Sequence, residues 1–162
     1  MARQKKKAEQ DEGIKLICRN RRALHDYAIV DKLECGIVLT GTEVKSLREG
    51  GTSLEDAYAR LDGGEVWLIG CDIPEYTYGN RLNHKPKRPR KLLLHRREIA
   101  RFADKATQRG FTLVPLRMYF RNGRAKVELA VARGKKEFDK RESAKKQEAQ
   151  REIRRAMTDR NR

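Results

Sequence analysis

The sequence has little cysteine, proline or aromatic residue, and it has no long apolar run. Three cysteines and four prolines occur among its 162 residues, and aromatic residues make up 6%. Cys18, Cys35 and Cys71 lie far apart and form no CxxC motif. They therefore indicate small buried side chains in a reducing cytoplasm rather than a disulfide framework. No apolar run approaches the ~18 residues that a membrane-spanning helix needs.

Catalytic and metal-binding patterns are missing as well. The three histidines, His25, His84 and His95, are scattered, and none has metal-ligand spacing. The chain contains no P-loop, no GxSxG and no HExxH motif. We therefore predict no catalytic residue, no metal site and no cofactor. One enzymatic alternative stays open, an RNA-processing enzyme in which His25, Glu34 and His95 converge as general acid and base near a phosphate.

Positive charge is what the sequence has in excess. Lysine and arginine number 39 against 23 acidic residues, a formal net charge of +16. A surplus of this size indicates a nucleic acid or an anionic membrane surface as the partner. The N-terminal lysines Lys5 to Lys7 are followed by no apolar stretch, so they do not form a secretory signal. We expect a cytoplasmic nucleic-acid-binding protein with no membrane partner.

The chain divides by composition into a polar arm (1–13), one folded domain (14–132) and a basic tail (133–162). In the tail, Phe138, Ile153 and Met157 are the large apolar residues. So few apolar residues cannot offset the entropy of ordering, and we expect the arm and the free tail to be disordered. Ala149, Ile153, Ala156 and Met157 would line one thin helix face, so the tail is predicted to fold against a polyanion. A solvated, solubilising tail is the alternative.

The central part of the chain is rich in β signals. Runs at 24–30 and 36–42 read as strands, and two hairpins are predicted around Asp62-Gly63-Gly64 and Asn122-Gly123. Pro115 predicts a bulge or an edge position in the strand before Asn122. Helices are expected at 43–48 and 95–108. The predicted fold is mainly β with a few helices, an oligonucleotide-binding (OB)-type β-barrel, with a sandwich as the alternative.

The densest cationic stretch of the folded part is 81–97, which holds eight lysines or arginines and no acid. Pro86 and Pro89 favour an extended loop there, which indicates a phosphate-tracking segment. Arg88, Arg90 and Lys91 are its candidate RNA contacts. Further upstream, His25, Asp26 and Tyr27 would alternate in direction in a strand, and a histidine or tyrosine on its outer face could stack on an unpaired base; the alternative is that one of the two belongs to the core.

Several longer segments together resemble a known family. Residues 20–27 read NRRALHDY, 88–94 read RPRKLLL and 134–141 read GKKEFDKR. With 36–48, 53–60, 64–68 and 113–116, they resemble the small protein B family, the bacterial SsrA-binding proteins. The resemblance covers about residues 16–156, and motifs of this length are jointly specific.

The resemblance implies a ribosome-rescue function. Members bind the tRNA-like domain of tmRNA and, with elongation factor Tu, deliver it to the vacant A site of stalled ribosomes. The tail folds in the empty mRNA channel against small-subunit rRNA and licenses trans-translation. The resemblance also implies an OB-type barrel, no enzymatic activity and a protein that acts as a monomer. A structural ribosomal protein is the remaining alternative from the residues alone.

The resemblance also implies which residues contact RNA. The family positions for tmRNA binding fall on Asn20, Glu34, Leu93 and Lys126, and His95 stands where many members have Asn. Other family RNA-facing segments contain His25, Tyr27, Arg88, Arg90 and Lys91. The ribosome-binding tail motif falls on Gly134, Lys135, Lys136, Phe138, Asp139, Lys140 and Arg141. Glu34 is unexpected on an RNA-binding face, but a carboxylate accepts from base amino groups or orients a cation such as Lys126; a simple surface ion pair is the alternative.

Overall fold

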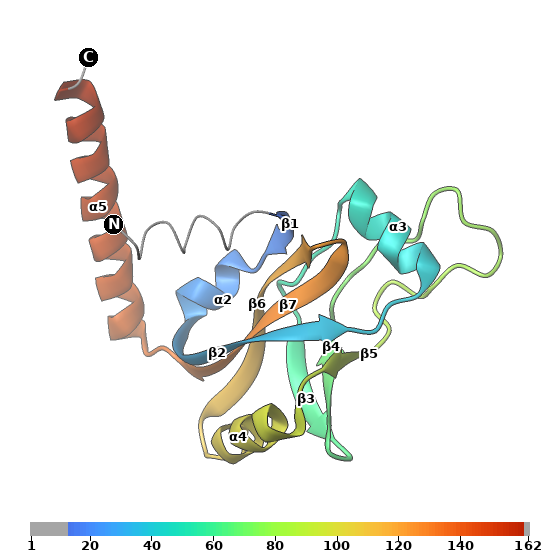
Figure 1. The fold of residues 1–162 in the computed structure, drawn as a ribbon. Coiled ribbons are helices and arrows are strands. Elements are labelled where there is room, and N and C mark those ends of the chain that lie inside the picture. The colour runs from blue at the N-terminus through green and yellow to red at the C-terminus, as the bar shows by residue number, and fades with distance from the viewer. Residues whose placement is uncertain (1–12, 161–162) are drawn as a thin grey trace.

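Antiparallel strands dominate the part of the chain that the structure, a computed structural model, describes, residues 13–160 (Figure 1). The strands are β1 (Ile14–Arg19), β2 (Tyr27–Ile37), β3 (Tyr58–Asp62), β4 (Glu65–Ile69), β5 (Arg90–Leu93), β6 (Phe111–Arg121) and β7 (Arg124–Gly134). The helices within these residues are α2 (Arg21–Asp26), α3 (Gly41–Glu49), α4 (Arg96–Ala106) and α5 (Glu137–Arg160). Apart from Gly13, the predicted N-terminal arm lies outside the described residues.

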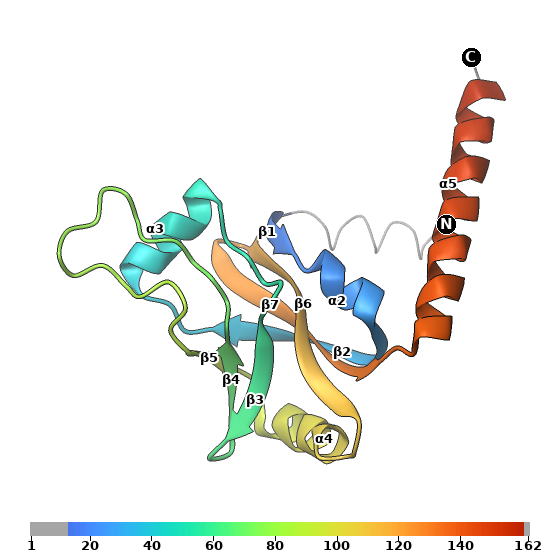
Figure 2. The ribbon, with the colours of Figure 1, turned by 180° about the vertical axis from the view of Figure 1, so that it is seen from behind.

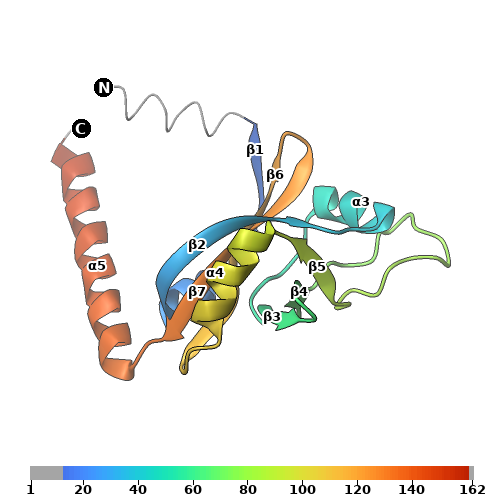
Figure 3. The same ribbon diagram turned by 60° about the horizontal axis from the view of Figure 1, so that its bottom comes forward.

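Six of the strands pair in a closed ring. The order along the sheet is β1-β6-β3-β4-β5-β2-β7, and β7 pairs back with β6. The β3–β6 junction is narrow, with the single partner pair Ala59↔Leu113. Strand β1 pairs with the C-terminal part of β6 (Figures 2 and 3), and its Ile17 and Cys18 pack against the core. This closure agrees with the mainly β fold expected from the sequence; the OB-type barrel remains a prediction.

Both hairpins predicted from glycine turns are confirmed. Strands β3 and β4 pair from Tyr58↔Ile69 to Asp62↔Glu65, and β6 and β7 pair across Arg121↔Arg124. Both turns use positive φ angles, including φ 50° at Asn122 and 75° at Gly123, a conformation that asparagine and glycine tolerate. The predicted bulge also exists, because the β6–β7 register shifts between Pro115 and Arg117.

Strand β7 divides the molecule into an inner and an outer face. Val127, Leu129 and Val131 are fully buried in the core inside the ring. The intervening Ala130 and Ala132 pack outward against Ala23 of α2 in a second cluster. Helix α2 covers the outer side of β7 only near Ala130 and Ala132, so the outer side at the other end of this strand stays open to solvent.

The segment 24–26 is helical rather than extended, which corrects the strand expected at 24–30. The side chain of Asn20 accepts a hydrogen bond from the Ala23 N–H at 2.9 Å and so caps α2. The chain becomes extended only at Tyr27, so the predicted strand-like alternation of His25, Asp26 and Tyr27 is wrong. The run at 36–42 is also shorter as a strand than expected, because β2 ends at Ile37 and α3 begins at Gly41.

The two predicted helices within the domain are confirmed with small changes of boundary. Helix α4 spans Arg96–Ala106 and inserts Phe102, which is fully buried, into the core. Helix α3 spans Gly41–Glu49 and contributes Leu47 to the same core. Cys35 and Cys71 are buried there and Cys18 is half-buried, all as free thiols. Burial raises the pKa of Cys35 and Cys71 to about 12, so these thiols are unreactive packing groups.

The basic tail is a helix in the structure, so the disorder expected of the free tail is not confirmed. Helix α5 extends away from the sheet, and its side chains are largely exposed (Figure 1). Strand β7 continues to Gly134, two residues beyond the predicted domain boundary. The root of the tail contacts α2: the Lys135 N–H donates to the Asp26 carbonyl at 2.9 Å, and Lys140 Nζ lies 3.4 Å from the Asp26 carboxylate. Within residues 13–160, no helix combines the length and apolarity needed to cross a membrane.

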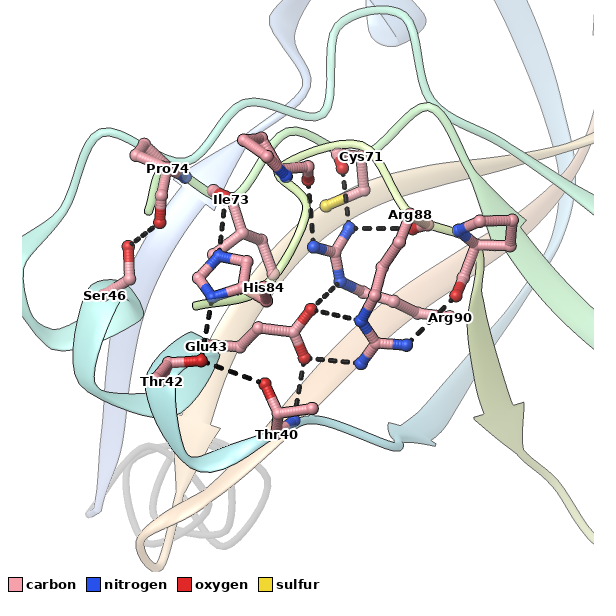
Figure 4. A network of polar contacts seen from close by, with 12 residues as sticks. Thr40, Thr42, Glu43, Ser46, Cys71, Ile73, Pro74, His84, Arg88 and Arg90 are labelled. Carbon is pink, nitrogen blue, oxygen red and sulfur yellow. Dashed lines mark hydrogen bonds and ion pairs between the residues drawn. The ribbon is translucent and has the colours of Figure 1, made fainter. Parts of the chain in front are cut away.

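A buried carboxylate holds the basic loop before β5 against α3 (Figure 4). Glu43 is fully buried, and its Oε1 accepts from Arg88 Nε at 2.7 Å and from Arg90 Nε at 2.8 Å. Its Oε2 accepts from Arg88 Nη2 at 2.6 Å and from the Thr40 N–H at 2.8 Å, which also caps the helix. Desolvation raises the pKa of Glu43, but the hydrogen bonds and charges of the arginines outweigh it and leave the pKa below its ordinary value.

We predict that Glu43→Gln destabilises the fold by about 3 to 5 kcal/mol, because it leaves Arg90 charged and buried without its counter-ion. Urea unfolding measures the loss. Glu49→Gln at the exposed end of the same helix is the matched control and should stay within ~0.5 kcal/mol of the parent. Since the pKa of Glu43 is lowered by folding, its contribution is present above the ordinary glutamate pKa and is lost as the pH falls. The free energy of unfolding of Glu43→Gln should therefore depend less steeply on pH in the acid range than that of the parent. Equal stability of Glu43→Gln and Glu49→Gln would show that the buried ion pair does not stabilise the fold.

Candidate nucleic-acid interface

The open end of the outer face, which α2 leaves uncovered, is hollowed. One hollow of about 530 Å³ is lined by Leu33, Glu34, Gly36, Leu93, Leu94, His95, Glu98 and Lys126. A second hollow, of about 630 Å³, shares Glu34 and extends toward β6. Its lining includes Arg117 and Tyr119 of β6, Lys32 of β2 and Glu128 of β7. A third, of about 360 Å³, shares Leu93 and Lys126 and extends toward α3. The three hollows form one continuous surface, which we call the outer face.

Strand alternation explains why these side chains share one face. Lys126 and Glu128 point away from the core because their neighbours Val127 and Leu129 point into it. In the register, Lys126 lies opposite Gly36 of β2 and Tyr119 of β6, and Glu128 lies opposite Glu34 and Arg117. The bulge after Pro115 lets Leu116 remain in the cluster that packs on α2 while Arg117 still reaches the open part of the face.

Glu34 is held as an anion on this face. Tyr119 donates its hydroxyl to Glu34 Oε2, and Arg121 Nη1 donates to the same oxygen at 2.8 Å. Desolvation raises the pKa of Glu34, but these two donors and the nearby charges of Arg121 and Lys126 bring it below its ordinary value. Burial, together with the hydrogen bond to Glu34, in turn raises the pKa of Tyr119. The carboxylate is therefore ionised and fixed in position, with Oε1 free of hydrogen bonds among the described residues.

The second acid on the face, Glu128, is also paired. Arg117 Nε donates to Glu128 Oε2 at 2.7 Å, and Lys32 Nζ lies 3.5 Å from Oε1. Arg117 additionally stacks over the ring of Tyr119, 5.0 Å from its centroid. Glu34 and Glu128 lie opposite each other on neighbouring strands and would repel, but the ion pairs that each makes offset this repulsion. Lys126 makes no ion pair with any described residue, so its charge is available to a ligand.

Leu93 is an exposed apolar residue at the centre of this polar surface. It lies opposite Gly36, and a Cβ on Gly36 would come within 3.1 Å of the Leu93 Cβ. Glycine at this position therefore lets β5 carry Leu93 close over β2, where its side chain remains 51% exposed. An apolar group flanked by Glu34 and Lys126 suits the flat face of a base more than it suits water.

His95 is exposed next to Leu93, at the start of α4. Its backbone N–H donates to Glu98 Oε2 at 2.8 Å, which fixes the start of the helix. Of the sequence-predicted tmRNA contacts, the structure thus gathers Glu34, Leu93, His95 and Lys126 in one hollow. Their RNA contacts themselves remain a prediction.

Asn20 does not join them, and its expected contact with RNA needs correction. The residue is 2% exposed, and its side-chain nitrogen donates to the Leu54 carbonyl at 2.9 Å and the Pro115 carbonyl at 3.1 Å. Its side-chain oxygen is occupied by the Ala23 N–H. Asn20 therefore positions α2 against β6, and it affects a ligand only through that helix.

The cations of the basic loop also differ from expectation. Arg90 is fully buried and bonded to Glu43 and to the carbonyls of Cys71, Arg88 and Pro86, so it cannot contact RNA as predicted. Arg88 is bound to Glu43 through two nitrogens, with its side chain 29% exposed. Lys91 pairs with Glu65 on the neighbouring strand β4. These side chains mainly build the fold, and a charge pattern in sequence cannot reveal that Glu43 pairs with Arg88 and Arg90 or that Glu65 pairs with Lys91.

His25 and Tyr27 lie at the end of α2, apart from the hollow of Glu34. His25 is exposed and its Nδ1 lies 2.9 Å from Asp26 Oδ1. Tyr27 is half-buried, packs against the second cluster and lines a smaller hollow with Asn20 and Asp26. The convergence of His25 with Glu34 and His95 that an RNA-processing enzyme would need is therefore absent from the structure of residues 13–160, although Glu34 and His95 do share a hollow.

The tail motif lies at the junction of β7 and α5. Gly134 ends β7, and Lys135 Nζ contacts the Leu24 carbonyl at 3.2 Å. Asp139 and Arg141 are exposed in the first turns of α5, and Lys136 is exposed just before the helix. Lys140 contacts Asp26 as described above. Phe138 lies in α5, and its side chain is outside those the structure describes.

Sequence reasoning missed Tyr119, Arg117 and Arg121. Their spacing, every second residue before the Asn122-Gly123 turn, was the available signal, because it places all three on one side of a strand. The bulge after Pro115 and the pairing with β2 decide which side that is. No group of three or more metal-ligating residues occurs within residues 13–160.

The fold and this face together define a class: a small, strongly basic, mainly β protein with a broad, open, charged surface rather than an enclosed pocket. Such a surface suits a large polyanion better than a small molecule. Comparison with known proteins agrees. The SmpB protein family model matches residues 17–159, so the chain belongs to the SmpB family.

Named relatives match nearly the whole chain. An "SsrA-binding protein" of Thermobifida fusca is 60% identical over 97% of this chain and 98% of its own length. Another of Saccharopolyspora erythraea is 57% identical over 91% of this chain and 94% of its own. A chain in a solved structure described as "tmRNA-SmpB: a journey to the center of the bacterial ribosome" is 50% identical, with a TM-score of 0.64 over 74% of this chain and 85% of that chain.

We predict that Tyr119→Phe raises the pKa of Glu34, because it removes a hydrogen bond to the charged carboxylate. A carbon-13 NMR titration of the Glu34 carboxyl measures the change. Tyr58→Phe on β3, which changes an exposed tyrosine, is the control and should leave the pKa of Glu34 where it was. A Glu34 pKa that does not move in Tyr119→Phe would show that Arg121 alone holds the anion.

Proposed function

We propose that this protein is an RNA-binding ribosome-rescue factor that binds the tRNA-like domain of tmRNA. It delivers that RNA, together with elongation factor Tu, to the vacant A site of stalled ribosomes. The tail then acts in the empty mRNA channel against small-subunit rRNA and licenses trans-translation. The protein performs this role as a cytoplasmic monomer, without a cofactor and without catalysing a reaction itself.

One observation carries the proposal: the outer face gathers Glu34, Leu93, His95 and Lys126 in a chain that belongs to the SmpB family. Each group suits a folded RNA. Glu34 is an ionised acceptor for base amino groups, Lys126 is a cation for phosphate without an ion-pair partner among the described residues, and Leu93 offers an apolar surface to a base. The names SsrA-binding protein and tmRNA-SmpB that its relatives carry favour tmRNA over other RNAs.

The domain boundaries suit a division of labour. We infer an OB-type barrel for residues 14–134 that binds tmRNA, and a tail from Lys135 onward that contacts the ribosome. The tail carries its cations on a helix whose side chains are mostly exposed, and the Lys140–Asp26 contact links its root to α2. Within residues 13–160 this helix contacts α2 at its root, and a helix held there is easily redirected, which suits a segment that enters a channel once the domain has docked.

Binding of a tmRNA tRNA-like-domain transcript to the outer face is tested by Leu93→Asp. The substitution places a second anion beside Glu34 and removes the apolar contact, so affinity in a filter-binding assay should fall at least tenfold. Ile153→Asp on α5 is the matched control, since Ile153 is 54% exposed and the charge change is the same. Equal affinities for the two variants would refute binding at this face.

Truncation after Lys136 should leave affinity for the same transcript within about tenfold, or ~1.4 kcal/mol, of the full chain. The reason is that the outer face lies entirely within residues 14–134, and this end point preserves the whole of β7. Thermal unfolding of the shortened chain controls for its stability. A greater loss of affinity would mean that α5 contributes to tmRNA binding and that the proposed division is misplaced.

The triple variant Asp139→Ala, Lys140→Ala, Arg141→Ala should keep tmRNA affinity but abolish peptide tagging on stalled ribosomes in a reconstituted translation assay. We expect these residues to contact ribosomal RNA after docking. Asp26→Asn controls for the Lys140–Asp26 contact, because it weakens that contact and leaves the tail residues in place. Normal tagging by the triple variant would favour a tail that is merely a tether.

A further inference from the structure

The loop between β4 and β5 exposes large apolar side chains far from the tail. Residues 75–88, which we call loop 75–88, project beyond α3 at the end of the molecule opposite α5 (Figures 1 and 2). Tyr78 is 82% exposed and Leu82 is 85% exposed, more than the other exposed large hydrophobic residues of the described chain. Side chains of this kind are costly to present to water, so their exposure indicates a partner.

Loop 75–88 is ordered by its own hydrogen bonds. The Asn83 side chain donates to the Tyr76 carbonyl at 2.9 Å and accepts from the Tyr76 N–H at 3.3 Å. The Gly79 N–H donates to the same carbonyl at 2.8 Å. Glycine is needed there, because a Cβ on Gly79 would lie 2.5 Å from Asn83 Nδ2. The loop is therefore built to hold one shape rather than to adapt.

Its base is fixed to α3 by the buried polar network (Figure 4). His84 is 6% exposed; its Nε2 donates to the Ile73 carbonyl at 2.9 Å, which leaves Nδ1 to accept from the Thr42 hydroxyl at 3.0 Å. Ser46 donates its hydroxyl to the Pro74 carbonyl, and Arg88 binds Glu43. Tyr76 packs edge-on against Tyr78, with ring centroids 5.8 Å apart, and this contact helps to fix the position of the Tyr78 ring.

The charge around these side chains is almost entirely positive. Arg81, Lys85 and Lys87 are exposed on loop 75–88 and make no ion pair with any residue in 13–160. Lys45 of α3 lies over the Tyr76 ring, 5.5 Å from its centroid. Glu75 is the one acid in the loop sequence. Aromatic and apolar groups surrounded by these cations match an unpaired nucleotide, whose base stacks while its phosphates bind the cations.

The loop is also continuous with the outer face. The hollow that begins at Leu93 and Lys126 continues past Leu39 to Val44 of α3. The next residue is Lys45, which lies over Tyr76. Helix α3 therefore borders both the hollow at Leu93 and Lys126 and loop 75–88.

We propose that loop 75–88 is a second contact for the RNA that occupies the outer face. Tyr78 and Leu82 receive an unpaired base of that RNA, and Arg81, Lys85 and Lys87 hold the adjoining phosphates. The inference rests on the proposed function, because it takes the same RNA as the ligand. It adds a stacking site to the salt-dependent contacts of the outer face.

The test compares the full chain with Tyr78→Ala/Leu82→Ala, using the tRNA-like-domain transcript of tmRNA as the probe. Losing one stacked base should weaken binding by about 5- to 150-fold. The slope of log affinity against log salt should stay the same, because a stacking contact releases no counter-ions. Tyr78→Phe alone, which keeps the ring, should bind like the parent.

The cationic variant Arg81→Ala/Lys85→Ala/Lys87→Ala should instead flatten the salt slope, by about 0.7 for each single-strand phosphate that the variant no longer neutralises. Tyr58→Ala, an exposed tyrosine on β3, is the matched control and should change neither quantity. Thermal unfolding of each variant separates a local effect on binding from a general effect on the fold.

The outcomes separate this inference from the proposed function. If the parent protein fails to bind the transcript, the proposed function is wrong; if Leu93→Asp binds normally, RNA does not occupy the outer face and the loop inference, which takes that RNA as its ligand, is wrong. If the parent binds and Leu93→Asp does not, but Tyr78→Ala/Leu82→Ala binds like the parent, the proposed function stands and the loop inference is overturned. In that case loop 75–88 serves a different class of partner, such as a protein.

Discussion

The contact of Glu43 with Arg88 and Arg90 is the interaction on which the arrangement of the surfaces depends. It joins α3 to the chain entering β5 by placing one buried carboxylate between the buried guanidinium of Arg90 and the partly exposed guanidinium of Arg88. On one side of this contact, β5 carries Leu93 over Gly36 into the outer face. On the other side, loop 75–88 leaves the body with its base bound to Thr42 and Ser46 of α3. Both surfaces are therefore positioned by the buried carboxylate of Glu43. Its pairing also gives Arg88 and Arg90 a structural role.

The outer face carries two fixed negative charges, Glu34 and Glu128, in a strongly positive protein. A protein of net charge +16 would attract any polyanion, so charge alone gives no specificity. Glu34 and Glu128 break that uniform field at defined points, each fixed by arginine or tyrosine donors. The face consequently repels a misplaced phosphate beside Glu34, while Lys126 attracts one nearby. This alternation suits the recognition of a folded RNA in one register, with the tail left free to act elsewhere.

The sequence was sufficient for the features that depend on local chemistry. Glycine turns located both hairpins, Pro115 located the bulge, and the apolar stripe of 95–108 located α4, because each signal acts over a few residues. Features set by contacts between distant residues were missed or misread. The helix at Arg21–Asp26 exists because Asn20 caps it while bound to Leu54 and Pro115. Arg90 is buried because it pairs with Glu43, and these two residues are 47 positions apart in the sequence. The family resemblance supplied Glu34, Leu93 and Lys126, but only the fold explains why an acid, an apolar residue and a lysine lie together.

Photo-crosslinking tests most directly whether RNA lies on the outer face around Leu93. The tRNA-like-domain transcript is crosslinked to full-length protein that carries a photoreactive amino acid in place of Leu93, or in place of the exposed Arg60 on β3. We expect a strong crosslink from position 93 and background yield from position 60. Equal yields from the two positions, or a crosslink from position 60 alone, would contradict this placement of the RNA.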